Sequence, residues 1–169
     1  SGSRPAAFLR SYCEVYLREE VQAEALVRQI GPFHRFLEVA ARVNGQTVNV
    51  AGISRDAGIA RQTANDFFQI LVDTLLATWL PAWKLKRAVK QVAHPKFYIF
   101  DTGVARQLAG SAHLPVHPEE RGALLETFLL HELRARLHYQ DLEYPIAYWQ
   151  AHGGGEVDFV IETRNHLVA

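Results

Sequence analysis

The segment from residue 148 to 162 constrains the fold of this chain more than any other. Tyr148-Trp149 forms an aromatic pair, Gly153–Gly155 follows, and apolar and acidic side chains then largely alternate over Glu156–Glu162. Alternation with a period of two predicts a half-buried strand, and consecutive glycines supply the backbone freedom of a tight turn. Another strand is predicted from residue 166, close to the end of the chain. We therefore expect a β-sheet in the second half, and a fragment of a longer protein.

The charge of the chain is unevenly distributed although its net charge is zero. Residues 1–101 hold 13 Lys and Arg against 9 Asp and Glu, whereas residues 102–169 hold 5 against 9. The two halves therefore carry +4 and −4. This split predicts two modules with different surfaces, and it suggests a nucleic-acid partner for the first.

Cysteine content and hydropathy bear on the location of the protein. The single Cys13 cannot form an internal disulfide, so a reducing cytoplasm is expected, and its thiol is predicted to be buried. No apolar run approaches the ~20 residues of a membrane span, so no membrane partner is expected. The chain contains no methionine, and Ser1-Gly2-Ser3 is typical of an expression tag.

The first half of the chain is predicted to be mostly helical. Apolar spacing predicts helices at residues 5–30, 33–43, 49–57 and 60–77. Gly31-Pro32 is expected to end the first helix, and Asn49 to cap the third. A glycine turn at Gly58 then joins two helices, as in a helix-turn-helix.

The helix at 60–77 has two distinct faces. The residues expected to face inward are Phe67, Phe68, Leu71, Val72, Leu75 and Leu76. Those expected to face outward are Arg61, Gln62, Asn65, Asp66, Gln69 and Asp73. Arg, Gln and Asn are the side chains that read base edges, so Arg61, Gln62 and Asn65 are candidate DNA-binding residues. The alternative is an ordinary solvated face, because the two aspartates would repel phosphates.

Two strands, 79–83 and 96–100, are predicted to follow this helix as the hairpin, or wing, of a winged helix. Five basic residues and no acidic residue lie between Asp73 and Asp101: Lys84, Lys86, Arg87, Lys90 and Lys96. Such a wing can neutralise phosphates, which predicts weak, salt-dependent DNA binding through Lys84, Lys86, Arg87 and Lys90. A solvated, lysine-rich loop is the alternative.

Two further helices are predicted at 102–109 and 119–139. In the longer helix an apolar stripe is expected to face the core, formed by Leu125, Leu129, Leu133 and Leu137. Glu126 lies within this stripe, and a carboxylate there must be paired, hydrogen-bonded or part of a site. The alternative is a residue at the rim of the core that reaches solvent or pairs with an arginine.

Taken together, these segments resemble the C-terminal region of a bacterial and archaeal family of AAA-type, P-loop ATPases. The matching segments are Tyr12-x-x-x-Tyr16-Leu17-x-x-Glu20-Val21, Ala60–Thr63, His94–Gly103, Gly122–Phe128, Tyr148-Trp149 and Glu156–Phe159. The resemblance implies a winged helix followed by a domain of unknown function with a restriction-endonuclease-like core. It also implies an ATPase module in cis, whose G-x-x-x-x-G-K-[ST] motif is absent from this chain.

The resemblance also implies a candidate catalytic or metal site. Restriction-endonuclease-like folds place one acid on a first helix and another on a strand, and the corresponding residues are Glu126 and Asp158. Such carboxylates hold Mg²⁺, while a lysine in a following Glu-x-Lys motif activates water. No Glu-x-Lys follows Asp158 in this chain.

The sequence thus predicts an α+β, mostly helical chain with a linker helix (1–31), a winged helix-turn-helix domain (32–110) and a truncated α/β restriction-endonuclease-like domain (111–169). Our first hypothesis is a non-catalytic regulatory module of an AAA-type ATPase that binds DNA or a partner. A metal-dependent nuclease domain lacking its last catalytic strand and a protein-interaction module are the alternatives. We expect the isolated chain to show neither ATPase nor nuclease activity, and ATP and Mg²⁺ to be cofactors of the full-length parent only.

Overall fold

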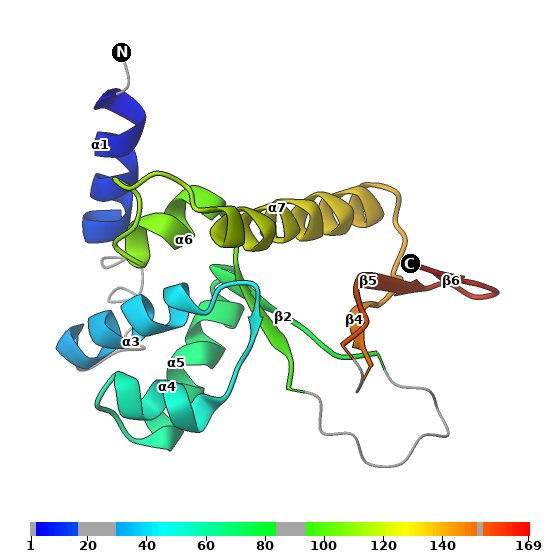
Figure 1. The fold of residues 1–169 in the computed structure, drawn as a ribbon, viewed down its shortest axis with the longest axis horizontal. Helices are drawn as coiled ribbons and strands as arrows, with labels where there is room; N and C mark the ends of the chain where they lie inside the picture. The colour runs from blue at the N-terminus through cyan, green and yellow to red at the C-terminus, as the bar shows by residue number, and fades with distance from the viewer. Residues whose placement is uncertain (1–2, 17–29, 84–93, 152–153) are drawn as a thin grey trace.

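The computed structural model describes residues 3–16, 30–83, 94–151 and 154–169. The chain is an α+β protein, about half helical, with two small antiparallel sheets (Figure 1). No helix in the described ranges combines the length and the apolar character needed to cross a bilayer.

The N-terminal segment is helical but is not one uniform helix. Helix α1 (Ser3–Ser11) continues into the short π-helix η1 (Tyr12–Tyr16), and residues 17–29 of the predicted helix lie outside the described part. Cys13 is buried, as predicted. Gly31-Pro32 was expected to end the helix, but it lies in the first turn of α3 (Ile30–Arg42). Proline is tolerated there because its missing N–H would have no intrahelical partner.

Two helices joined by a glycine turn follow α3, as the sequence predicts. Helix α4 (Val50–Asp56) is capped at its N-terminus by Asn49, whose side chain accepts a 3.1 Å hydrogen bond from the backbone N–H of Ala51. Gly58, at φ +65°, then leads to α5 (Arg61–Asp73).

Helix α5 ends four residues earlier than predicted. Leu75 adopts φ +60° and the chain enters strand β2 at Ala77. Leu75 was expected to face the core but is 80% exposed, because it lies in this reversal and not on the helix.

The first sheet contains β1 (Gln46–Thr47), β2 (Ala77–Leu80) and β3 (Lys96–Ile99), in the order β1-β3-β2. The predicted antiparallel pairing of the two longer strands is confirmed, although β2 begins and ends before the predicted 79–83. All four residues of β3 are buried because the strand has a core on each side. Phe97 and Ile99 face the helical core, whereas Tyr98 belongs to a second, smaller core.

Aromatic rings fill the helical core. The ring centroids of Phe36 and Phe68 lie 4.7 Å apart, and those of Phe68 and Phe97 lie 4.9 Å apart, both with edge-to-face geometry. Such packing adds to the free energy gained from burying the rings. It fixes α3 and α5 against the first sheet.

The second half contains two helices and the second sheet. Helix α6 (Thr102–Leu108) is capped by Asp101, which accepts a 2.8 Å hydrogen bond from Val104 N–H. Helix α7 covers Pro118–Tyr139. The strands are β4 (Ile146–Gln150), β5 (Glu156–Glu162) and β6 (Leu167–Val168), paired antiparallel in the order β4-β5-β6.

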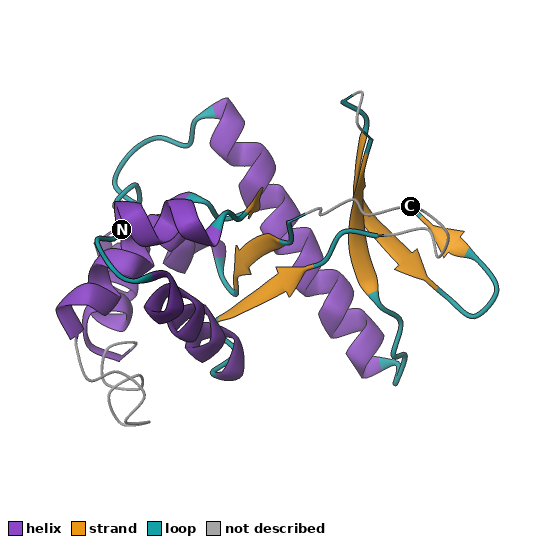
Figure 2. Cartoon of the chain, turned by 90° about the horizontal axis from the view of Figure 1, so that it is seen from below, coloured by secondary structure: helices purple, strands orange, loops and turns teal. Residues whose placement is uncertain are grey.

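The two sheets are connected through the residues after β2. Trp83 N–H donates to the carbonyl of Tyr148 at 2.6 Å, and Tyr148 N–H donates to the carbonyl of Pro81 at 3.0 Å. These residues therefore run parallel to β4. Seen from below, the strands lie in front of α7 (Figure 2).

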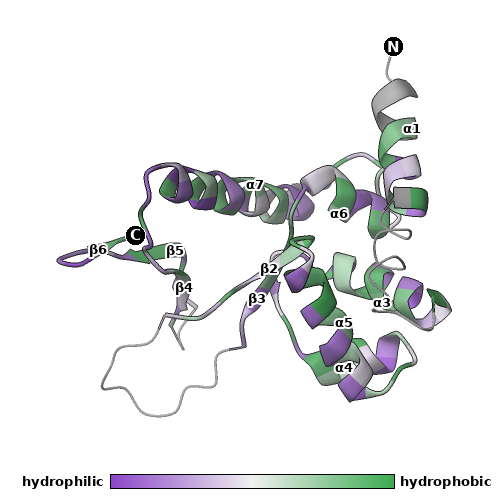
Figure 3. Ribbon diagram, turned by 180° about the vertical axis from the view of Figure 1, so that it is seen from behind, coloured by the Kyte–Doolittle hydropathy of each residue, from purple (hydrophilic) through white to green (hydrophobic). Residues whose placement is uncertain are grey.

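The buried face of α7 differs from the predicted leucine stripe. Leu125 and Leu129 are exposed, and the buried residues of the helix are Thr127 and Leu130. Hydrophobic and hydrophilic residues alternate along α7 (Figure 3), so periodicity alone does not define its inner face. The orientation of α7 is instead set by polar side chains that contact the first sheet.

Candidate functional site

Glu126 lies on the first half of α7 and faces strand β3. Its Oε2 accepts a 2.8 Å hydrogen bond from the hydroxyl of Tyr98 and lies 3.2 Å from Nζ of Lys96. Its side chain is 23% exposed, whereas Tyr98 is fully buried. The structure therefore pairs the predicted carboxylate with a lysine and a tyrosine of one strand.

Lys96 holds carboxylates from two different elements. Its side chain is 7% exposed and also forms an ion pair with Glu156, the first residue of β5. The ammonium lies 5.3 Å from the centroid of the Tyr148 ring. Burial alone would lower the pKa of Lys96, but the hydrogen bond to Glu156 and the charge of Glu126 outweigh it, so this pKa stands above its usual value.

This position of Lys96 corrects its assignment to a solvated basic wing. The residue begins a strand that is buried on both faces, and its alternation with Tyr98 places both side chains on one side of the sheet. The signal in the sequence that could have predicted a buried charge is the position of Lys96 directly before the apolar residues 97–100. Neither Glu156 nor Tyr98 was identified from the sequence as a partner.

Asp158 lies two residues after Glu156 on β5 and is exposed. Burial raises the pKa of the Tyr98 hydroxyl, and the negative charges of Glu126, Asp158 and Glu156 raise it further. Asp158 therefore raises the pKa of the same Tyr98 hydroxyl that donates a hydrogen bond to Glu126. Within the described ranges the Asp158 side chain makes no hydrogen bond or ion pair.

A Mg²⁺ site at Glu126 and Asp158 stays a prediction. Among the described residues, no group of three or more His, Cys, Asp or Glu side chains is arranged to hold a metal ion. Glu126 instead already has a cation, because the Lys96 ammonium lies between it and Glu156. This donor set does not suit a divalent ion, since Lys96 would repel it.

The predicted DNA-reading residues lie on the exposed face of α5. Arg61, Gln62 and Asn65 are all exposed. Gln62 donates a 2.9 Å hydrogen bond to Asp66, and Gln69 donates one of 2.7 Å to Asp73, so both glutamines are engaged along the helix. The basic residues Lys84, Lys86, Arg87 and Lys90 lie outside the described part of the chain.

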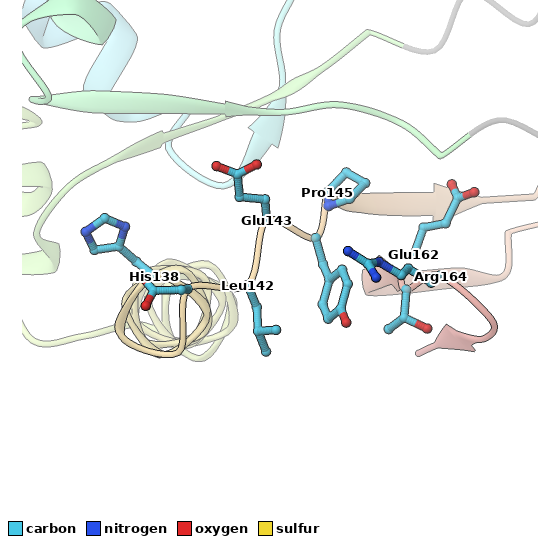
Figure 4. A pocket seen from close by; sticks show the side chains of 9 residues that line it. His138, Leu142, Glu143, Pro145, Glu162 and Arg164 are labelled. Atoms are coloured by element: carbon cyan, nitrogen blue, oxygen red, sulfur yellow. The ribbon is translucent and has the colours of Figure 1, made fainter.

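A cavity of about 660 Å³ lies between the end of α7 and the end of β5. His138 stands on one side of it, with Glu162 and Arg164 on the other (Figure 4). It contains neither Glu126 nor Asp158, and its charged residues are of both signs. The candidate carboxylate site is therefore separate from this cavity.

The architecture defines an α+β protein with two small antiparallel sheets, the first packed with the helices of residues 30–73 and the second following α7. A family model described as a domain of unknown function, DUF8612, matches residues 1–114, two thirds of the chain, and the chain belongs to this family. A second domain of unknown function, DUF4143, matches residues 121–169.

Two curated relatives are similar in sequence to almost the whole chain. They are the uncharacterized protein Mb2031c of Mycobacterium bovis and the uncharacterized protein Rv2008c of Mycobacterium tuberculosis. Each is 27% identical over 164 residues, which make up 96% of this chain and 36% of the relative. The chain therefore spans about a third of the length of these relatives. No solved structure matches it significantly.

Proposed function

We propose that this chain is a non-catalytic, DNA-binding module of the winged-helix type that serves a larger AAA-type ATPase. The observation that carries the proposal is the exposed polar face of α5, which follows a helix and a glycine turn and precedes an antiparallel strand pair. The order α3-β1-α4-α5-β2-β3, with the sheet order β1-β3-β2, supports the winged-helix type, because a helix pair joined by a turn is followed by an antiparallel strand pair. In such folds the helix equivalent to α5 enters the major groove.

The pairing of Lys96 supports a binding role over a catalytic one. A metal-dependent nuclease needs carboxylates that are free to hold Mg²⁺. Here Glu126 and Glu156 are each paired with one buried ammonium that joins β3 to α7 and β5. This arrangement favours a role in holding the two units together.

The resemblance to the C-terminal regions of AAA-type ATPases supports the assignment to such a parent. The length of the relatives leaves room for an ATPase module, because the matched region accounts for only 36% of them. We place the parent in the cytoplasm and its ATP and Mg²⁺ in the ATPase module.

Fluorescence anisotropy with a labelled DNA duplex tests the proposal. We expect a dissociation constant of about 1–100 μM that rises steeply with salt, as for binding governed by phosphate contacts. Arg61→Ala should weaken binding by about tenfold, and the double substitution of Lys84 and Lys86 by Glu should also flatten the salt dependence. Arg136→Ala, an exposed arginine on α7, is the matched control and should leave binding unchanged.

Two results would contradict the proposal. One is the absence of DNA binding even at low salt, which would favour the protein-interaction alternative. The other is Mg²⁺-dependent cleavage of DNA that disappears in Asp158→Ala, which would establish the nuclease.

A further inference from the structure

The outward side of α7 carries a cluster of large apolar residues that no described element covers. Leu125, Phe128 and Leu129 are 56%, 55% and 41% exposed. In Figure 1 the strands lie on one side of α7, and no helix or strand is drawn against the opposite side. Contiguous apolar surface of this kind is typical of an interaction site.

Two charged residues flank this cluster along the helix. Arg121 precedes it and Glu132 follows it, and both are exposed. Neither forms an ion pair within the described ranges. At about 100° per residue, Arg121, Leu125, Phe128, Leu129 and Glu132 fall within an arc of roughly 100°, and we call these five residues the α7 outer face.

The α7 outer face is complementary to itself. When two copies of a helix pack antiparallel about a two-fold axis, a residue of one copy lies opposite the residue of the other copy whose number adds with its own to a fixed total. Arg121 and Glu132 add to the same total as Leu125 and Phe128. A single axis therefore places Arg121 opposite Glu132 of the second copy, and Leu125 opposite its Phe128.

We propose that the α7 outer face binds a second copy of this chain in an antiparallel, isologous helix pair. Leu125, Phe128 and Leu129 of both copies form the apolar centre, and two Arg121–Glu132 ion pairs close its ends, about 16 Å apart along each helix. The two ion pairs fix the antiparallel register, because a parallel pair would bring like charges together. One helix per copy is a small interface, so the dimer is weak, with a dissociation constant above about 1 μM.

Sedimentation equilibrium of the whole chain between about 1 μM and 1 mM tests the dimer. We expect a reversible monomer–dimer equilibrium. Phe128→Ser should raise the dissociation constant by about tenfold or more, because it removes a central apolar contact twice. Phe8→Ser is the matched control, since Phe8 is also an exposed phenylalanine, 69% on α1 against 55% for Phe128, and it should have no effect.

Exchange of the two charges tests the register separately. Arg121→Glu or Glu132→Arg alone should weaken the dimer about three- to tenfold, and the double variant should restore it to within about twofold. Both residues are exposed and neither forms an ion pair with another described residue, so neither change should perturb folding.

A chain that stays monomeric up to about 1 mM would overturn the proposal. So would a dimer that survives Phe128→Ser but is lost when the exposed Leu167 and Val168 of β6 are replaced, because its interface would then be the edge of the second sheet. Single charge variants that weaken the dimer without rescue by the double variant would overturn the antiparallel register.

Discussion

The side-chain amide of Asn44 donates a 2.8 Å hydrogen bond to the hydroxyl of Thr127, 83 positions away, and both side chains are buried. Asn44 Oδ1 accepts a 2.8 Å hydrogen bond from Ile99 N–H, and the Thr127 hydroxyl donates to the Ala123 carbonyl at 2.7 Å. This relay ties the end of α3, strand β3 and helix α7 together. It also joins the two parts of the chain that match different family models.

Removing this relay should destabilise the fold. We expect Asn44→Ala to lower the free energy of unfolding by about 2–3 kcal/mol, because Ile99 N–H and the Thr127 hydroxyl lose a buried partner. Urea denaturation measures the loss. Asn65→Ala, at an exposed asparagine of α5, should change stability by no more than about 0.5 kcal/mol. Equal losses in the two variants would show that the relay contributes nothing specific.

The second prediction concerns Lys96. Lys96→Met leaves the carboxylates of Glu126 and Glu156 facing one another without a cation. Breaking such a pair costs about 3–5 kcal/mol when it is fully buried, and we expect the lower end because both glutamates are partly exposed. Adding Glu126→Gln and Glu156→Gln to Lys96→Met should recover part of the loss. A triple variant as unstable as the single one would assign the effect to packing of the lysine chain.

The ion pairs of Lys96 also make a prediction for alkaline pH. Because the pKa of Lys96 is raised on folding, its contribution to stability is complete below pH 10.5 and is lost as the pH rises through the higher pKa of the folded state. Chemical denaturation at increasing pH should therefore show a loss of stability above pH 10.5 that is smaller in Lys96→Met. A loss of equal size in both proteins would assign the alkaline transition to other groups.

His131 should make the fold sensitive to mildly acidic pH. Its Nε2 lies 3.0 Å from the carbonyl of Ile99, which can only accept, so Nε2 carries the proton. Burial lowers the pKa of His131, and nearby Arg134 lowers it further, against the opposing effects of the Ile99 hydrogen bond and Asp101. The unfolded chain takes up a proton near pH 6.5 and the folded chain only at lower pH, so stability falls as the pH falls below about 6.5.

Denaturation curves between pH 7 and pH 5 measure this effect. His131→Gln keeps a donor to the Ile99 carbonyl but cannot titrate, so its stability should depend less on pH. His113→Gln, at an exposed histidine, should retain the slope of the wild-type protein. A wild-type slope in His131→Gln would contradict the assignment.

Cys13 should be unreactive in the folded protein. Burial raises the pKa of its thiol to about 11, with further contributions from Asp101 and Glu14, so almost no thiolate is present at neutral pH. Ellman's reagent should modify it slowly until the chain is unfolded. In a Cys13→Ser background, Val15→Cys places a thiol at an exposed position and should react rapidly. Equally rapid labelling of native Cys13 would show that the N-terminal helix opens readily.

Features that depend on neighbouring residues were predictable from the sequence. The cap at Asn49 was predicted because short polar side chains accept hydrogen bonds from the first turn of a helix. The alternation over Glu156–Glu162 predicted strand β5, and Gly154, at φ +96°, lies in the predicted glycine turn before it. These features are local, since they need only a few consecutive residues.

The inner face of α7 was not predictable in this way. Leucines recur every four residues from Leu125, yet Thr127 and Leu130 are the buried positions. Asn44 and strand β3 select that face by hydrogen bonds to Thr127 and Glu126. The helix turns its polar residues inward because partners from distant parts of the chain satisfy them there.

The sequence by itself determined most of the helices and strands, because spacing and caps act over a few residues. Only the tertiary structure decided that Lys96 is buried between Glu126 and Glu156, respectively 30 and 60 positions away along the chain. A lysine in a sequence is equally compatible with solvent and with an ion pair. The choice depends on whether folding brings carboxylates close enough to offset the cost of removing its charge from water.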